Sequence, residues 1–233
     1  ARGKEISQSV ADIMNKAGVD YACLGNEETC TGDSARRIGN EYLFQSMAEK
    51  NKEIFAQYNF KKIVTQCPHC FTTLKNDYAE LGIDLEVSHH SQFIDELIES
   101  KKISPDAWID EDITFHDPCY LGRHNNEYDA PRNVLQSVLR NGKINEMKKS
   151  KSESFCCGAG GGNMWYEIKT GERVNQNRIN QAVETNAKTV AAACNFCNIM
   201  LEDGVKTTGN EETLKVLDIA EMVSQGLVEK EPV

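Results

Sequence analysis

The sequence lacks the features of several protein classes. No apolar run in its 233 residues approaches the roughly 18 to 20 residues that a membrane-spanning helix needs, so we expect no transmembrane segment in this chain. Basic residues are too few, 26 against 36 acidic ones, and the net charge of -10 argues against nucleic acid and against anionic membrane surfaces as partners. No signal segment opens the chain and Ala1 is not a methionine, so we expect the chain to be processed, cut or only partly represented at its start.

A dinucleotide-binding fingerprint is also missing. The glycine run at 158–162 places Asn163 where the third glycine of G-x-G-x-x-G would stand, and no acidic residue ends a second strand about 20 positions later. The sequence thus carries no nicotinamide or flavin motif. If the chain carries out redox chemistry, its electrons arrive from another domain or subunit.

Cysteine, by contrast, is abundant, with nine residues. Disulfide frameworks are typical of short secreted chains, whereas this chain is long, and the adjacent Cys156 and Cys157 cannot easily bridge each other. A second ordinary role is that of a small buried hydrophobe. That role suits Cys23 in the strand-like YACLG at 21–25, which we expect in the core. The other eight stand at repeated spacings, which neither role explains.

These spacings reveal an internal repeat. Between Cys30 and the C-x-x-C at 67–70 lie 36 residues, and the same number lies between Cys157 and the C-x-x-C at 194–197. The two sets are therefore offset by 127 positions. In both, a short apolar strand runs into C-x-x-C, and a helix, a second strand and an amphipathic helix follow. Alternating strands and helices predict an α/β fold of two repeated βα units, each a small parallel sheet covered by helices.

We place the boundary between the units in the polar segment 101–112. The first unit, residues 1–110, is then degenerate and incomplete at its N-terminus, and the second, residues 111–233, is complete. Each C-x-x-C falls at the carboxyl end of a strand, where open α/β sheets place their ligands. The elements expected before the first C-x-x-C are a helix over 4–17, a strand near 20–24 and a long helix near 33–57.

The second unit has more cysteines than a zinc ion needs. Zinc takes four ligands in a tetrahedron, and adjacent cysteine side chains diverge, which suits a larger group with several metal atoms. Soft thiolates without an obligatory histidine also favour an iron–sulfur cluster. A zinc-stabilised structural module stays open as an alternative. The candidate ligands are Cys119, Cys156, Cys157, Cys194 and Cys197.

The first unit departs from this pattern, because Thr29 stands where the first of two adjacent cysteines should be. Its candidate ligands, Cys30, Cys67 and Cys70, predict a second [4Fe-4S] cluster, a zinc ion or no metal at all. A thioredoxin-type role for Cys67 and Cys70 would leave Cys30 unexplained. Carrying the repeat offset back from Cys119 places a fourth cysteine near position -8 or -9, so we expect an upstream cysteine and a sheet that lacks one edge strand here.

Several neighbours of the cysteines are candidates for supporting roles. His116 and His124 flank Cys119 and either hydrogen-bond to cluster sulfur, move a proton or close a turn. Gly158 and Gly160 allow backbone N–H groups to approach sulfur.

Three further side chains carry expectations about burial. His69, inside the first C-x-x-C, is expected to face outward. Trp165 and Tyr166, which follow the glycines, are expected in the core.

The pattern Cys119-x36-Cys156-Cys157-Gly158-x35-Cys194-x-x-Cys197 resembles the cysteine-rich CCG domain of heterodisulfide reductase subunits and of the iron–sulfur subunits of glycolate, lactate and glycerol-3-phosphate oxidoreductases. HDPCYLGRHN at 116–125 and FCCGAGGG are most similar to heterodisulfide-reductase-related (Fe-S)-binding proteins. The resemblance implies that the five cysteines hold a non-cubane [4Fe-4S] cluster. It also implies a flavoprotein or ferredoxin-like electron donor, a membrane quinone or cytochrome b partner, and a cytoplasmic location, free or tethered to the inner face of the membrane.

These observations favour an electron-transfer subunit of a heterodisulfide-reductase-like oxidoreductase, which relays electrons to a quinone or thiol acceptor. The alternative is a reductase that cleaves a substrate disulfide directly at the cluster. The zinc-stabilised structural module is the third hypothesis.

Overall fold

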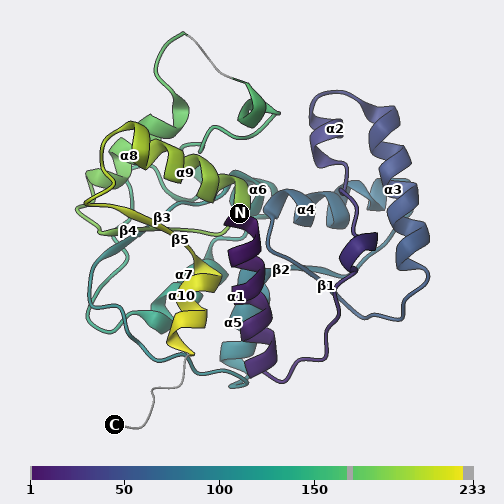
Figure 1. Cartoon of the computed structure of the whole chain (residues 1–233), viewed down its shortest axis with the longest axis horizontal. Coiled ribbons are helices and arrows are strands. Elements are labelled where there is room, and N and C mark those ends of the chain that lie inside the picture. Colours follow the sequence, from purple (N-terminus) through teal and green to yellow (C-terminus); the bar gives the residue numbers. More distant parts are fainter. Residues whose placement is uncertain (1, 167–169, 228–233) are drawn as a thin grey trace.

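Two small parallel sheets organise the chain (Figure 1). This computed structural model describes residues 2–166 and 170–227. The first sheet pairs β1 (Ile63–Thr65) with β2 (Val87–His89). The second has the order β3 (Ile113–Phe115), β4 (Thr189–Ala192) and β5 (Lys215–Asp218). The expected α/β class, with small parallel sheets covered by helices, is confirmed.

The residues of β3 and β4 explain why they lie in a sheet covered on both faces. Every position of both strands is buried, and the residues are small, β-branched or aromatic. Parallel pairing aligns Ile113 with Thr189 and Val190 with Val216. Parallel strands need long crossover connections, which the helices provide. The carboxyl ends of the strands therefore meet at one edge of each sheet.

Helices cover both sheets. In the first half they are α1 (Arg2–Lys16), α2 (Asp33–Arg37), α3 (Glu41–Phe55), α4 (Pro68–Thr72) and α5 (His90–Glu99). After α4 the chain continues as a π-helical turn, Thr73–Asp77, and a 3-10 turn, Ala79–Leu81. In the second half they are α6 (Cys119–Asn125), α7 (Asp129–Val138), α8 (Val174–Val183), α9 (Asn195–Thr207) and α10 (Ile219–Gly226). Short 3-10 turns lie at Gly25–Glu27, Lys151–Glu153 and Asn163–Trp165.

The single long helix expected near 33–57 is wrong, because the chain breaks between α2 and α3. Gly39 has a φ of 86°, which L side chains adopt with strain, and it ends α2. The side chain of Asn40 then accepts a hydrogen bond from the N–H of Leu43 and caps α3.

Three other expectations about the first and second halves are corrected. Residues 20–24 form no strand, and without a sheet to cover it Cys23 is exposed rather than buried. Trp165 and Tyr166 are 63% and 72% exposed instead of lying in the core, because the glycine turn carries them out along the surface.

The first sheet has two strands in the described residues, where the second has three. By the repeat, β1 and β2 correspond to β4 and β5, so the first sheet lacks a counterpart of β3, as expected.

Corresponding or adjacent positions of the two halves lie against each other. His90, which follows the N-cap residue of α5, and Asp218, the N-cap residue of α10, are joined by a hydrogen bond of 3.0 Å between wholly buried side chains. His69 and Phe196, 127 apart, pack edge to face with ring centroids 5.1 Å apart. Contacts between equivalent positions are what a twofold axis produces in a dimer. The two halves therefore pack as an internal pseudo-dimer, and one hydrophobic core, containing Phe71 and Phe115, runs through both.

Candidate metal centre

Three helix starts bring the cysteines together near the pseudo-twofold axis. Cys67 and Cys194 immediately precede α4 and α9, and Cys119 is the first residue of α6. Helices α4 and α6 pack against each other across the two halves (Figure 1). The positive ends of the helix dipoles therefore face the sulfur atoms, which favours thiolates and anionic groups.

Seven thiols form one continuous row. Neighbouring thiols in the row are close enough to shift each other's pKa, in the order Cys119, Cys156, Cys157, Cys197, Cys194, Cys67 and Cys70. The structure thus brings together all five expected cluster cysteines of the second half. It also joins them to two cysteines of the first half, through Cys67 and Cys194, which are again 127 positions apart.

The half-buried end of the row contains Cys119 and Cys156. Hydrogen bonds from the thiols of Cys119 and Cys157, with a further bond from the N–H of Gly158 at 3.2 Å, lower the pKa of Cys156 to about 2. The thiol of Cys119 has its pKa raised, because it donates to Cys156 and is partly buried. Gly158 reaches this position with a φ of 95°, close to the side chain of Val174. The site therefore stabilises a thiolate at Cys156.

The buried part of the row contains the two C-x-x-C motifs. Burial opposes the charged form of Cys194, but hydrogen bonds from the thiols of Cys197 and Cys67 lower its pKa to about 6. The pKa of Cys67 is raised, mainly because its thiol donates to Cys194. In both motifs the N–H of the last cysteine also donates to the sulfur of the first. These backbone N–H groups would still donate to the same sulfurs if the sulfurs bound a cluster.

The first-half cysteines are less enclosed. Cys30 is exposed and accepts a hydrogen bond from the N–H of Gly32 at 3.4 Å, while Thr31 lies 3.6 Å from the sulfur of Cys70. Thr29, which replaces a cysteine of the pattern, donates its hydroxyl to Asn51 at 2.8 Å. Thr29 therefore stabilises the loop instead of supplying a metal ligand.

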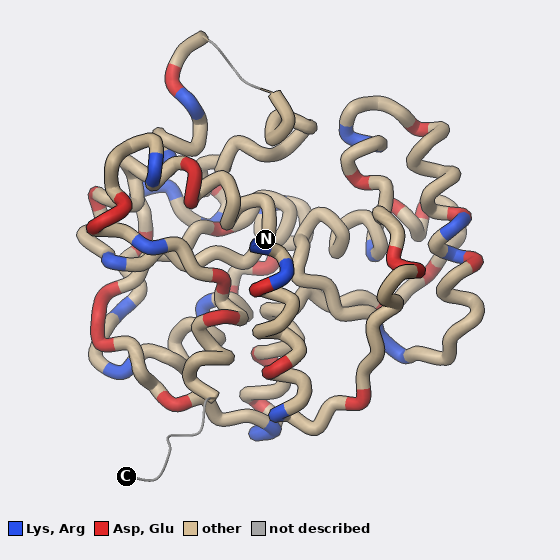
Figure 2. Tube along the Cα trace, viewed as in Figure 1, with Lys and Arg blue, Asp and Glu red and all other residues tan. Residues whose placement is uncertain are grey.

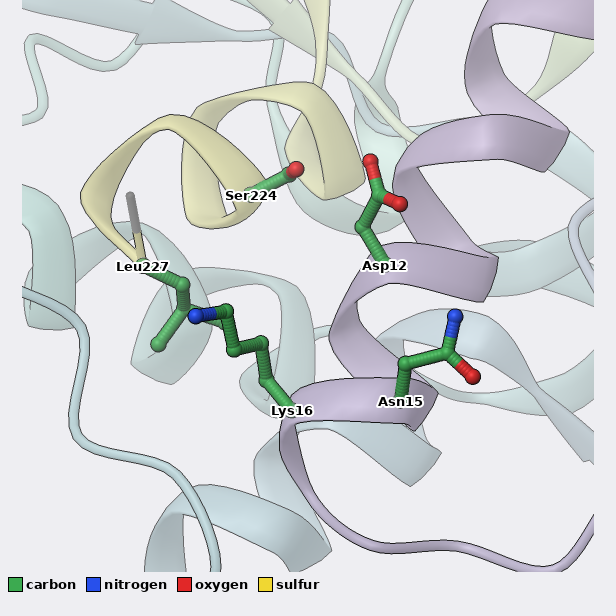
Figure 3. A pocket seen from close by; sticks show the side chains of 5 residues that line it. All are labelled: Asp12, Asn15, Lys16, Ser224 and Leu227. Carbon is green, nitrogen blue, oxygen red and sulfur yellow. The ribbon is translucent and has the colours of Figure 1, made fainter. Parts of the chain in front are cut away.

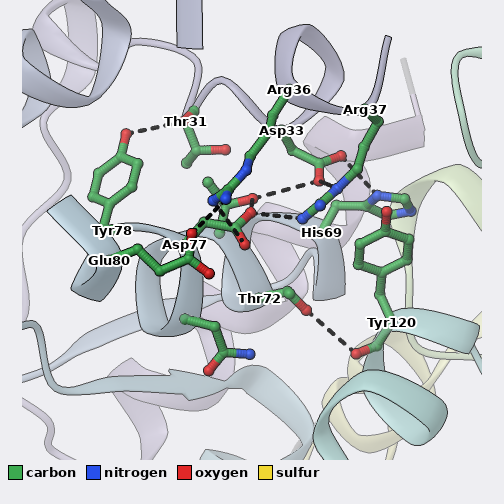
Figure 4. A network of polar contacts seen from close by, with 12 residues as sticks. Thr31, Asp33, Arg36, Arg37, His69, Thr72, Asp77, Tyr78, Glu80 and Tyr120 are labelled. Carbon is green, nitrogen blue, oxygen red and sulfur yellow. Dashed lines mark hydrogen bonds and ion pairs between the residues drawn. The ribbon is translucent and has the colours of Figure 1, made fainter. Parts of the chain in front are cut away.

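His69 does not face outward as expected, because it is buried in a network of charges between the halves (Figure 4). Its Nδ1 lies 2.8 Å from Asp33, and its ring stacks on Tyr120 at 3.8 Å. Asp33 also accepts a hydrogen bond from Arg37 at 3.0 Å. The hydrogen bond with His69 lowers the pKa of Asp33 against the opposing effect of burial, so its carboxylate stays ionised.

Arg37 links this pair to further charges beside the site. It lies 2.6 Å from Asp77, which also pairs with Arg36 at 3.2 Å. Arg36 and Arg37 thus balance carboxylates here. Arg123 donates to the carbonyl of Ser154.

His116 is buried beside the sulfur row. One of its ring nitrogens lies within 4.8 Å of the sulfurs of Cys157 and Cys197. Its Nδ1 accepts a hydrogen bond of 3.0 Å from Nε of Arg178, and its Nε2 has no hydrogen-bond partner. Burial and the nearby charge of Arg178 hold the pKa of His116 well below its usual range.

The remaining candidates lie at the margin of the site. His124 stacks on Tyr120 at 4.4 Å, and burial lowers its pKa. A side chain added at Gly160 would meet no other atom within 4 Å. The exposed Trp165 touches only the edge of Phe196, with ring centroids 6.1 Å apart.

Two cavities among the described residues are lined by none of the cysteines. A cavity of about 280 Å³ lies between α1 and the end of α10 (Figure 3). It is lined by Asp12, Asn15, Lys16, Ser224 and Leu227 and by none of the cysteines. A smaller one of about 50 Å³ lies under the glycine turn, beside Gly158 and Met200.

Figure 2 shows basic residues interspersed with acidic ones along the chain. This arrangement is unlike the basic face that nucleic acid requires.

Comparison with known proteins agrees with the geometry. The CCG family of cysteine-rich domains matches residues 1–75 and 113–202, one copy in each half, and the chain belongs to this family. It is 43% identical over 229 residues to an EtfAB:quinone oxidoreductase of Syntrophomonas wolfei, covering 95% of this chain and 32% of that protein. It is 43% identical to the probable iron-sulfur-binding oxidoreductase FadF of Bacillus subtilis, covering 97% and 32%.

A third relative is a subunit of the dihydromethanophenazine:CoB--CoM heterodisulfide reductase of Methanosarcina barkeri, 36% identical, with 92% of this chain and 53% of that protein covered. The chain thus spans from about a third to about a half of the length of these relatives, 32% to 53%. All three relatives are named as oxidoreductases or as a subunit of a reductase, and FadF is also named as iron–sulfur-binding. A further relative, from Chromohalobacter salexigens, is named a probable membrane-anchored ferredoxin. Among the residues that the structure describes, no helix has the length and apolar character to cross a membrane.

Sequence reasoning missed three features of the site. The Cys67–Cys194 contact could have been suspected from the equal repeat positions of the two residues. The Asp33–His69 and Arg178–His116 pairs had no such signal, because nothing in the sequence singles out Asp33 or Arg178.

Proposed function

We propose that this chain is the iron–sulfur electron-transfer part of a heterodisulfide-reductase-like oxidoreductase. The observation that carries the proposal is the continuous row of thiols, in which Cys157, Cys194 and Cys197 are at most 4% exposed. Soft sulfur donors in this number exceed the needs of one tetrahedral metal ion and fit a cluster of several irons. A cluster buried within a rigid α/β fold suits an electron relay, which passes electrons on while the cluster stays bound to its thiolates.

The proposed ligands are Cys119, Cys156, Cys157, Cys194 and Cys197. When bound, a cluster there would supply one-electron transfer, and family membership favours the non-cubane [4Fe-4S] type. The protein's own part is to hold the thiolates and to direct N–H groups at them. Gly158 donates to Cys156, and the N–H of Ala159 lowers the pKa of Cys157 in the same way.

The division into units at 1–110 and 111–233 and a metal site at Cys30, Cys67 and Cys70 are also part of the proposal. The contact of Cys67 with Cys194 supports a first-unit site that adjoins the cluster. A cysteine upstream of Ala1 would give this site its fourth thiolate, the number that zinc or a conventional cluster takes.

The partners follow from the relatives. One of them carries a quinone in its name and another a heterodisulfide. We propose a flavoprotein or ferredoxin-like domain as the electron donor and a membrane quinone, a cytochrome b component or a thiol couple as the acceptor. The chain would then work on the cytoplasmic side of the membrane, free or tethered through other segments or a partner.

Metal analysis of anaerobically purified protein tests the proposal. We expect about four irons and acid-labile sulfide in comparable amount at the second-unit site, with a reversible one-electron signal in electron paramagnetic resonance during a redox titration. Zinc in place of iron at Cys119, Cys156, Cys157, Cys194 and Cys197 would show a structural module and refute the electron-transfer function.

Direct disulfide reduction is the second candidate, and the half-buried end of the row favours it. Cys119 and Cys156 lie partly open to solvent, where a substrate sulfur has access. The reaction consumes two electrons and two protons and turns one disulfide into two thiols. Titrating the oxidised protein with small disulfides separates the candidates, because a reductase should develop a new, substrate-dependent paramagnetic signal and a relay should not.

A further inference from the structure

Arg178 is an unusual residue to find inside the molecule. Its side chain is wholly buried, and all its polar contacts are made to uncharged groups: His116, the carbonyl of Lys149, Gln181 and Ser154. Burial lowers its pKa to about 10, so it stays positively charged at neutral pH. A buried cation without a directly paired carboxylate is costly to keep. Its position is explained if its charge and its hydrogen bond act on the sulfur site.

The contact between Arg178 and His116 determines which ring nitrogen carries the proton. A guanidinium group can only donate hydrogen bonds. Because Nε of Arg178 donates to Nδ1 of His116 at 3.0 Å, Nδ1 must offer a lone pair, and the proton of the neutral ring belongs on Nε2. Nε2 is also the atom left without a partner, in a side chain that is 1% exposed.

We propose that Arg178 holds His116 in the Nε2–H tautomer so that this N–H donates to a sulfur of the cluster site and raises its reduction potential. Arg178 is then a positioning residue that acts through His116. The inference rests on the proposed iron–sulfur function. The candidate sulfurs are those of Cys157 and Cys197, which lie within 4.8 Å of a His116 nitrogen. A donor to sulfur stabilises the additional negative charge of the reduced state more than it stabilises the oxidised state.

The same geometry argues against His116 as a metal ligand, although it stands with Cys157 and Cys197 in a group that could hold an ion. A ligating Nε2 needs its lone pair, which would put the proton on Nδ1. That proton would point at the donor N–H of Arg178. Histidine ligands of metals usually donate their other N–H to a carboxylate or a carbonyl, and Arg178 is the opposite kind of partner.

Pulsed electron paramagnetic resonance of the cluster-containing chain tests the assignment. After exchange into D₂O, we expect, beside the deuterons of the backbone N–H groups that donate to the sulfurs, one further deuteron coupled to the cluster that depends on His116, and only a weak coupling to the nitrogen of His116. Both should disappear in His116→Phe and persist in His124→Phe, the matched control in which a histidine at the margin of the site is removed. A strong nitrogen coupling that disappears in His116→Phe would show ligation and overturn the proposal.

Redox titration provides the second measurement. His116→Phe should decrease the equilibrium constant for one-electron reduction by about tenfold, equivalent to about 59 mV. His116→Gln, whose amide N–H can replace Nε2–H, should restore part of the loss. Arg178→Met should lower the potential in the unmodified chain and have a much smaller effect in the His116→Phe background.

Equal effects of Arg178→Met in both backgrounds would mean that only its charge acts on the cluster, and the positioning role would be wrong. Iron and sulfide content, measured on every sample, separates this failure from failure of the proposed function. If the unmodified chain holds no cluster, both proposals fall. If it holds one without the His116-dependent deuteron, only this inference falls.

Discussion

At the residue scale, the adjacent cysteines Cys156 and Cys157 show how two neighbours acquire opposite properties. Cys156 is half-buried and its pKa is lowered to about 2 by bonds from other thiols and from Gly158. Cys157 is buried and its pKa is raised to about 12, chiefly because its thiol donates to Cys156. Neighbouring side chains in such different surroundings are suited to different atoms of a large group rather than to one small ion.

Serine substitution separates the site cysteines from the others. Cys157→Ser should lose the second-unit cluster, because one thiolate of a shared site is removed. Cys23→Ser should keep the full iron and sulfide content and change the free energy of unfolding by no more than about 0.5 kcal/mol, since Cys23 is exposed. Metal analysis and urea unfolding measure the two effects. Equal iron loss in both variants would show that Cys23 belongs to the metal site.

At the scale of elements, the helix that carries Arg178, α8, approaches α9 closely. Helix α8 carries Arg178, and α9 begins directly after Cys194. A side chain added at Gly204 of α9 would come within 2.8 Å of Ile179 and 3.0 Å of the carbonyl of Asn175, both on α8. The absence of a side chain at Gly204 therefore sets the distance between the two helices.

Gly204→Ala should destabilise the chain by about 1–3 kcal/mol, because the added methyl group forces α8 and α9 apart. Gly3→Ala is the matched control. Gly3 is also helical, but the nearest atom to an added side chain is 3.8 Å away, so this change should be neutral or stabilise by up to about 1 kcal/mol. Urea unfolding of the two variants gives the comparison. A harmless Gly204→Ala would show that α8 and α9 are not in close contact.

At the scale of the whole molecule, buried contacts between the corresponding ends of the two halves hold them together. His90 bonds to Asp218, whose other oxygen accepts from Asn198 at 2.9 Å. His89 lies near the backbone of Gln66 and Ala193, the residues that directly precede the two C-x-x-C motifs. Burial, assisted by the neighbouring His90, holds the pKa of His89 well below its usual value. The centre of the pseudo-dimer therefore depends on a histidine that stays uncharged.

This burial predicts a pH dependence of stability. Below about pH 6.5, the usual pKa of an unfolded histidine, the unfolded chain binds a proton that folded His89 does not. The free energy of unfolding should therefore fall as the pH decreases below about 6.5, with a slope of up to about 1.4 kcal/mol per pH unit from this residue. The full contribution is present above that pH.

His89→Phe should reduce that slope, and the midpoint of urea unfolding measured between about pH 5 and 8 in both proteins tests it. His124→Phe, at a less buried position, is the control and should change the slope less. An identical slope in His89→Phe and the unmodified chain would contradict the prediction.

Much of the fold and the cysteine set could be predicted from the sequence. The repeat of C-x-x-C, the α/β class and the absent counterpart of β3 follow from spacing and periodicity, which are local properties of the chain. Local sequence signals gave wrong predictions at positions whose structure depends on tertiary packing. YACLG at 21–25 has the composition of a strand, but no neighbouring strand pairs with it. Trp165 and Tyr166 have core-like side chains on a turn that leads them to the surface.

The sequence by itself determined that eight cysteines stand in a repeated pattern suited to binding a cluster of several irons through soft thiolates. The type of a ligand and its spacing along the chain are properties of the sequence alone. Only the tertiary structure decided that Cys67 and Cys194 touch, so that the two units share one row of sulfur. It also decided that Arg178, 62 positions from His116, selects the tautomer of that ring. Such contacts depend on how the helices cross and where the pseudo-twofold axis falls, and these follow from the packing of both halves together.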